Sequence, residues 1–101
     1  MFNINELEIV DDKWIFANQF TENVIYQIRI ANGQIVKSWD LSALQWRQKE
    51  LVLDKKDVWN SRDDKDDVLN GIAHRKSTDT FFVTGSMWDL ITEIKLDYVI
   101  N

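Results

Sequence analysis

The sequence predicts an all-β chain in which one unit of three strands occurs twice. The two copies run from Asn5 to Ile30 and from Asn70 to Leu96, and each reads as strand, turn, strand, turn, strand. Short polar turns separate the strands, and apolar side chains alternate with polar ones along several of them. A unit that recurs in this way is the signature of a β-repeat architecture such as a propeller. We therefore expect a β-propeller fragment of about two four-stranded antiparallel blades.

The strands of the first copy differ in their patterns. Two alternate polar and apolar residues, as half-buried strands do, and Trp14–Asn18 between them is almost wholly apolar, as an inner strand is. The Asn32-Gly33 pair favours a two-residue hairpin with positive φ at both turn positions before a fourth strand. The expected strands of this blade are Glu6–Val10, Trp14–Asn18, Val24–Ile30 and Ile35–Trp39.

The second copy is expected to repeat this arrangement. In the overlay, Asn5 falls on Asn70, Phe16 falls on Val83, and Val24–Ile30 lies on Leu90–Leu96. The last residues, from Tyr98, are expected either to begin another strand or to close the structure against a neighbouring element.

The middle of the chain breaks the strand pattern. Leu41–Glu50 changes to helical spacing, so we expect a short helix there. Lys49–Asp67 is dense in charges of both signs, and its Asp-Asp-Lys-Asp-Asp run lacks the glycine and the distal glutamate of an EF-hand loop. A solvated excursion is therefore favoured over a calcium site. We expect one partial propeller domain over 1–101, with a blade at 5–39, the helix and charged excursion at 40–67, and a second partial blade at 68–101.

Composition excludes several classes of function. A net charge of -5 without a basic stripe argues against binding to nucleic acid, which depends on lysine and arginine. The absence of cysteine excludes disulfides and thiolate metal sites, and no apolar run approaches the ~20 residues of a membrane helix. No metal is expected. The first ten residues show no basic segment followed by an apolar one, so no secretory signal is visible.

Three motifs carry a resemblance to a known family. NELEIVDDKWIFANQF begins at Asn5, DVLNGIAH begins at Asp67, and FVTGSMWDLITEIKL begins at Phe82. In this order and spacing they closely resemble the C-terminal portion of the plant- and bacterial-type glutamine cyclotransferases, which are glutaminyl-peptide cyclotransferases built as five-bladed β-propellers. The resemblance implies conversion of an N-terminal glutaminyl residue of a peptide to pyroglutamate, with release of ammonia and without a cofactor. It also implies a secreted or periplasmic protein, although the sequence leaves the compartment open.

The resemblance suggests three site residues. Asn5 corresponds to the asparagine of the family's Asn-Glu-Leu-Glu motif, a donor to the oxyanion, although it could equally well tie a propeller turn. Phe20 takes the place of a pocket tryptophan and would keep an apolar wall for the substrate, or would simply pack within the blade. Ser86 stands where the family has the lysine of a Thr-Gly-Lys motif, so the positive charge at the oxyanion site is lost. The family's catalytic glutamate lies in a portion that the resemblance does not cover.

The sequence leaves two functional alternatives open. The chain is either part of a cyclotransferase weakened by the loss of lysine at Ser86, or a non-catalytic propeller that binds peptide or protein ends. Its exposed blade faces also require cover, either by the remaining propeller blades or by self-association. Lone His74 is interpreted as a surface or packing residue rather than a catalytic base.

Overall fold

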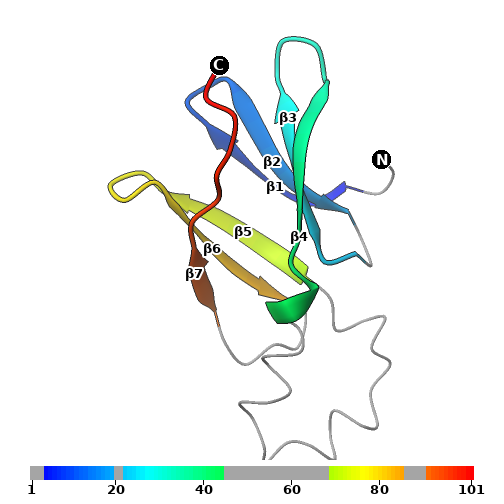
Figure 1. The fold of residues 1–101 in the computed structure, drawn as a ribbon, viewed down its shortest axis with the longest axis vertical. Coiled ribbons are helices and arrows are strands. Elements are labelled where there is room, and N and C mark those ends of the chain that lie inside the picture. The colour runs from blue at the N-terminus through cyan, green and yellow to red at the C-terminus, as the bar shows by residue number, and fades with distance from the viewer. Residues whose placement is uncertain (1–3, 20–21, 45–68, 86–90) are drawn as a thin grey trace, which may run out of the picture.

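The fold consists of two antiparallel sheets (Figure 1). The computed structural model describes residues 4–19, 22–44, 69–85 and 91–101. In the first sheet the strand order is β1-β2-β3-β4, and in the second sheet it is β5-β6-β7. The strands are β1 (Ile4–Val10), β2 (Trp14–Gln19), β3 (Val24–Arg29), β4 (Ile35–Asp40), β5 (Leu69–Arg75), β6 (Thr80–Gly85) and β7 (Thr92–Ile94).

The prediction of an all-β propeller fragment is confirmed. The strands of the first sheet agree with the expected ranges to within two residues at each end. Of the expected helix, Ser42–Leu44 is helical, and its remainder lies outside the described residues together with the charged excursion. The last strand is shorter than expected, because β7 contains only Thr92–Ile94 and the chain from Lys95 onward leaves the sheet.

The two sheets have the same strand register up to their first hairpin turns. In the first sheet the pairing shifts by one residue between Ile4 and Glu6, so that Asn5 forms a bulge in β1. In the second sheet an equivalent shift falls between Leu69 and Ile72. A bulge inserts an extra residue on one strand and locally re-aims its side chains. The repeat seen in the sequence therefore extends to an irregularity of the backbone.

The register also corrects part of the sequence overlay. Leu7 pairs with Ala17, and its counterpart Ile72 pairs with Val83. Ala17, rather than Phe16, is therefore the counterpart of Val83. The second hairpin loop (76–79) is one residue longer than the first (11–13). The difference in residue number between corresponding positions of the two copies therefore increases by one after this loop, whereas the sequence overlay increased it by two. The overlay of the third strands agrees with the register.

One turn prediction was also wrong. At the Asn32-Gly33 pair only Gly33 has a positive φ, of 71°. Its N–H donates to the carbonyl of Arg29 at 2.8 Å, across a longer loop than the expected two-residue turn. The tight turn with two positive φ angles lies instead at Asp11 and Asp12, whose φ angles are 57° and 53°. Aspartate tolerates this left-handed region better than most residues.

The core lies between the two sheets. Phe16 of β2 is at its centre. The centroid of its ring lies 4.7 Å from that of Phe81 in β6 and 5.2 Å from that of Tyr98. Burial of such aromatic side chains provides the main favourable contribution to the association of the sheets. The buried apolar residues of this core are Val10, Trp14, Phe16, Ile25, Leu69, Phe81, Val83 and Leu96.

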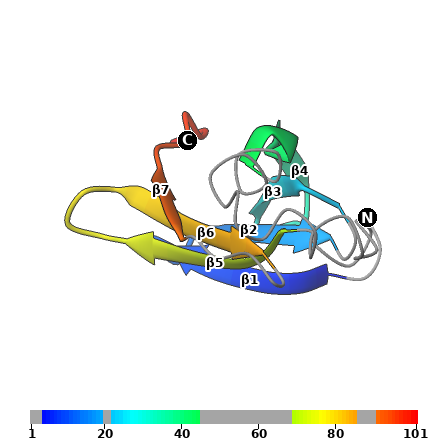
Figure 2. The same ribbon diagram turned by 90° about the horizontal axis from the view of Figure 1, so that it is seen from below.

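The C-terminal residues close the space between the sheets. They run from β7 to the face of β3 and β4, as both views show (Figures 1 and 2). The buried side-chain amide of Gln27 donates to the carbonyl of Val99 at 2.8 Å and accepts from its N–H at 2.9 Å. Trp39 donates from its indole nitrogen to the carboxylate of Asp97 at 2.8 Å. The final segment therefore packs against the first sheet and does not begin another strand.

Candidate functional site

Asn5, one of the predicted site residues, lies at the end of the sheets where β1 and β5 begin. The ladder pairs Ile4 with Gln19 and Leu69 with Gly85, so β2 and β6 end where β1 and β5 start. β1 and β5 are in contact along their length, and Figure 2 shows them at the same edge of the molecule. This geometry brings the bulges of both sheets together.

The two bulges present their asparagines to each other. The Nδ2 of Asn5 donates a hydrogen bond to Oδ1 of Asn70, so two residues that correspond in the repeat are bonded across the junction between the sheets. The Asn5 side chain is otherwise exposed. An amide nitrogen carries two hydrogens. Asn5 therefore has a second N–H that can donate to a bound molecule while the first keeps the side chain in place.

A buried asparagine, Asn18, forms hydrogen bonds to the first strand of each sheet. Asn18 is fully buried in β2, and its Oδ1 accepts from the N–H of Glu6 at 3.1 Å, next to the bulge. Its Nδ2 donates to the carbonyl of Leu69 at 2.8 Å. The N–H of Leu69 in turn donates to Oδ1 of Asn23 at 2.8 Å. Both polar groups of the Leu69 backbone are thus satisfied by asparagine side chains, as buried polar groups require.

The other two predicted site residues lie outside the described residues. Phe20 directly follows Gln19 at the end of β2, and Ser86 directly follows Gly85 at the end of β6. Of the three predicted residues, the structure therefore places only Asn5. The strand ends that precede Phe20 and Ser86 are at the same end of the sheets as Asn5.

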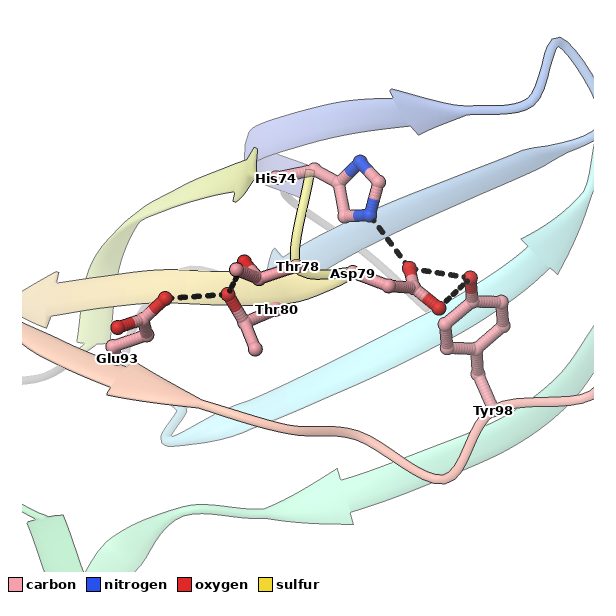
Figure 3. Close-up of polar contacts among 6 residues, drawn as sticks. All are labelled: His74, Thr78, Asp79, Thr80, Glu93 and Tyr98. Carbon is pink, nitrogen blue, oxygen red and sulfur yellow. Dashed lines mark hydrogen bonds and ion pairs between the residues drawn. The ribbon is translucent and has the colours of Figure 1, made fainter. Parts of the chain in front are cut away.

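A second polar cluster occupies the opposite end of β5 and β6 (Figure 3). The carboxylate of Asp79 contacts Nε2 of His74 at 2.8 Å and accepts from the hydroxyl of Tyr98 at 2.7 Å. The side chain of His74 is only 10% exposed. Its ring also packs on Phe81, with the centroids 4.9 Å apart. These contacts support the interpretation of His74 as a packing residue.

The cluster shifts the pKa values of two of its members. The hydrogen bond from His74, and then that from Tyr98, lower the pKa of Asp79 below its ordinary value. Burial, and then the hydrogen bond to Asp79, raise the pKa of Tyr98 to about 12. Both effects favour a neutral tyrosine beside a charged carboxylate. The cluster thus fastens the C-terminal segment to the hairpin turn that follows β5.

Comparison with protein families decides the classification. The family model described as glutamine cyclotransferase matches residues 1–96. The chain belongs to the glutamine cyclotransferase family. The resemblance found in the three sequence motifs is thereby confirmed.

A solved structure supports the same classification. The chain is similar to the crystal structure of Myxococcus xanthus glutaminyl cyclase, with a TM-score of 0.69 and 32% sequence identity. The match covers 96% of this chain but 37% of that protein, so the chain spans well under half of its relative's length. The comparison with curated proteins returned no match.

Within the described ranges, no group of three histidine, aspartate or glutamate side chains is placed to hold a metal ion. No helix in the described part of this cyclotransferase-family chain has the length and apolar character needed to cross a bilayer.

Two residues of the site were missed by sequence reasoning. Asn18 has a visible signal, because it is a polar residue in the otherwise apolar segment Trp14–Asn18, and a buried amide needs specific partners. Asn70 was treated only as the structural counterpart of Asn5. The repeat overlay already paired these two residues, but only the stacking of the sheets brings them into contact.

Proposed function

We propose that the chain forms one side of the active site of a glutaminyl-peptide cyclotransferase, in which Asn5 stabilises the oxyanion. The observation that supports this most strongly is the position of Asn5, whose amide is exposed at the site and oriented by Asn70, in a chain of the glutamine cyclotransferase family. The substrate would be a peptide with an N-terminal glutaminyl residue. Pyroglutamyl peptide and ammonia would be its products.

The reaction is an intramolecular acyl transfer. The free α-amine of the substrate attacks the carboxamide carbon of its own side chain, and the carbonyl oxygen becomes negatively charged. Collapse of this tetrahedral intermediate breaks the bond to the amide nitrogen, which leaves as ammonia with a proton that the α-amine has lost. Both reacting groups sit on one residue, so the enzyme gains much of its effect by holding the side chain folded back.

Asn5 suits the task of stabilising the oxyanion. Its amide is neutral and donates without any change of protonation state. Its bond to Asn70 fixes the direction of the group before substrate arrives, and preorganised donors of this kind contribute strongly to catalysis. The proposal requires the second N–H of Asn5 to point at the substrate oxygen.

Sequence supports two further assignments within the proposal. Phe20 would form an apolar wall of the substrate pocket, and Ser86 would face the oxyanion in place of the family's lysine. A serine hydroxyl donates one hydrogen bond but carries no positive charge. Loss of a donor at such a site typically lowers the rate by about 10²–10³. We therefore expect weak activity, and Ser86→Lys should raise it.

The chain should not act alone. The family's general acid and base, a glutamate, lies in a portion that the resemblance does not include, and the solved relative is far longer than this chain. We expect the isolated chain to release no ammonia from a glutaminyl peptide. The proposed active site becomes complete only when further propeller blades supply the carboxyl group.

A graft tests this proposal. Residues 1–96 would replace the matched part of Myxococcus xanthus glutaminyl cyclase, and ammonia release from a peptide with N-terminal glutamine would be measured. We expect slow turnover, accelerated at least about tenfold by Ser86→Lys. A folded graft that releases no ammonia with either residue would contradict the enzymatic function.

A non-catalytic function remains the alternative, and Ser86 is the observation that favours it. A propeller without the lysine would bind the ends of peptides or proteins without converting them. This alternative predicts that the folded graft binds a glutaminyl peptide in calorimetry, although the peptide is recovered unchanged after long incubation. Production of pyroglutamyl peptide would exclude it.

A further inference from the structure

Two of the three glycines in the chain directly follow an asparagine, at Asn32-Gly33 and at Asn70-Gly71. The carboxamide of an asparagine can cyclise with the backbone nitrogen of the next residue, and glycine favours this because it has no Cβ to obstruct the ring. Ring closure needs an accessible carboxamide and a backbone that can bring the nitrogen to the amide carbon. The two pairs share this chemistry but differ in their surroundings.

The Asn32-Gly33 pair lies in the turn between β3 and β4, where residues 30–35 are all exposed. Beyond the adjoining residues, a Cβ built on Gly33 would meet no heavy atom within 4 Å. Oδ1 of Asn32 accepts from the N–H of Gln34 at 3.0 Å. This Asx turn folds the carboxamide back over the peptide bond to Gly33. The N–H of Gln34 also polarises the carbonyl that becomes negatively charged when the ring closes.

One hydrogen bond in the turn opposes ring closure. The N–H of Gly33 donates to the carbonyl of Arg29 at 2.8 Å, so its nitrogen must leave this bond before it can attack. The bond lies in an exposed turn, where local opening costs little free energy compared with unfolding of the sheet. This contact therefore slows the reaction at Asn32 but does not block it.

The Asn70-Gly71 pair lies within β5, at the junction between the sheets. Oδ1 of Asn70 accepts from Nδ2 of Asn5, and the preceding Leu69 is fully buried. A Cβ on Gly71 would lie 2.9 Å from Cγ2 of Thr84 in β6. Ring closure here would require β5 to separate from β6 and from the first sheet, so its cost approaches that of global unfolding.

We propose that Asn32 is a site of self-modification, at which the carboxamide cyclises onto Gly33 and is converted to a carboxylate. Hydroxide removes the proton from the nitrogen of Gly33, and this nitrogen forms a bond to Cγ of Asn32. The bond from Cγ to Nδ2 breaks, and ammonia leaves with a proton from water. Water then opens the resulting succinimide at either carbonyl and yields an aspartyl or an isoaspartyl residue.

The modification changes the charge and the backbone of the turn. A neutral amide becomes a carboxylate, so the net charge of the chain goes from -5 to -6, since one negative charge is added. The isoaspartyl product also carries an additional methylene group in the main chain between β3 and β4. This modification is independent of the proposed cyclotransferase activity, because it needs no peptide substrate and releases a single ammonia molecule per chain.

Tryptic peptide mapping by mass spectrometry tests the modification after incubation of the folded chain at mildly alkaline pH. Trypsin separates the two pairs, because the peptide 30–37 contains Asn32 and a peptide that ends at Arg75 contains Asn70. In the folded chain Asn32 should be converted at least about tenfold faster than Asn70, because β5 must open before Asn70 can react. In urea the two rates should agree within about threefold, because both pairs are then equally accessible.

Asn32→Gln is the matched control, because its longer side chain closes a ring much more slowly, and Asn32→Asp provides the standard for the aspartyl product. Ion exchange should show an acidic form that accumulates in the wild type and is absent from Asn32→Gln. Circular dichroism shows whether the incubated chain is folded, and the graft with Myxococcus xanthus glutaminyl cyclase replaces an isolated chain that is not.

Three results would overturn the proposal. The first is an Asn32 that remains an amide in the folded chain over a period in which it is converted in urea. The second is conversion of Asn70 as fast as Asn32 in the folded chain. The third is formation of the acidic form by Asn32→Gln at the wild-type rate.

Discussion

The buried side-chain amide of Asn18 donates to the backbone carbonyl of Leu69 at 2.8 Å, and this bond joins the two sheets of the molecule. The same side chain accepts from the N–H of Glu6 beside the bulge that carries Asn5. Asn18 thus provides a hydrogen-bond partner for a backbone group near the start of β1 and for another at the start of β5. The stability of the junction and the position of the proposed oxyanion donor depend on the same side chain.

Asn18→Leu tests the stability of this junction. Leucine keeps a similar volume but leaves the buried carbonyl of Leu69 and the part-buried N–H of Glu6 without their partner, so we expect a loss of about 3 kcal/mol in the free energy of unfolding. Urea denaturation followed by tryptophan fluorescence measures it. Asn32→Ala, in an exposed turn, is the matched control and should cost less than about 1 kcal/mol. Equal losses in the two variants would contradict the role of Asn18.

Sequence reasoning predicted the strands because their signal is local. Alternation in Val24–Ile30 and the apolar run at Trp14–Asn18 each reflect burial of a strand by its own sheet. The recurrence of the three-strand unit predicted the propeller fragment, and the family motifs pointed to Asn5. These features depend on residues that are neighbours in the chain.

The contacts between the sheets were not predictable in the same way. The overlay placed Phe16 on Val83 because residue types match there, whereas hydrogen-bond pairing in the sheet decides the register and selects Ala17. The Asn32-Gly33 pair predicts a two-residue turn, but the pairing of the flanking strands sets a longer loop. The bond between Asn5 and Asn70 depends on how the sheets stack, which no local pattern encodes.

Gly71 is required by the close approach of β6. A Cβ at this position would lie 2.9 Å from Cγ2 of Thr84, closer than such contacts normally occur. Gly71→Ala should therefore lower the free energy of unfolding by about 1–3 kcal/mol. Thr84→Ser removes the opposing methyl group and should recover most of the loss in the double variant, as measured by urea denaturation of all four proteins. Additive losses would show that the contact with Thr84 is not the cause.

Tyr98 makes stability sensitive to alkaline pH. Its pKa is raised from 10.0 to about 12 in the folded chain, so the unfolded state ionises first as the pH rises. The contribution of the partly buried neutral phenol is fully present below pH 10 and is lost between pH 10 and about 12. Tyr98→Phe cannot ionise, so its free energy of unfolding should fall less steeply over this interval. Identical slopes for the two proteins would exclude Tyr98 as the source.

Asp79 makes stability sensitive to acid, so that its contribution is lost as the pH falls rather than as it rises. Its pKa lies below the ordinary value of 3.8, first because of His74 and then because of Tyr98. Its contribution is therefore present above that value and is lost as the pH falls through the lowered pKa. Asp79→Asn should flatten this acid limb of the stability curve, and asparagine also tolerates the positive φ of 55° at this position. An unchanged acid limb would contradict the linkage.

The most direct test of the proposed chemistry is the rate of ammonia release from a peptide with N-terminal glutamine by the graft with Myxococcus xanthus glutaminyl cyclase. Asn5→Ala should lower kcat by about 10², because it removes an oxyanion donor while the exposed position tolerates alanine. The Asn32→Ala graft should keep the full rate. An Asn5→Ala graft that remains folded and releases ammonia as fast as the Asn32→Ala graft would show that Asn5 only ties the two sheets together.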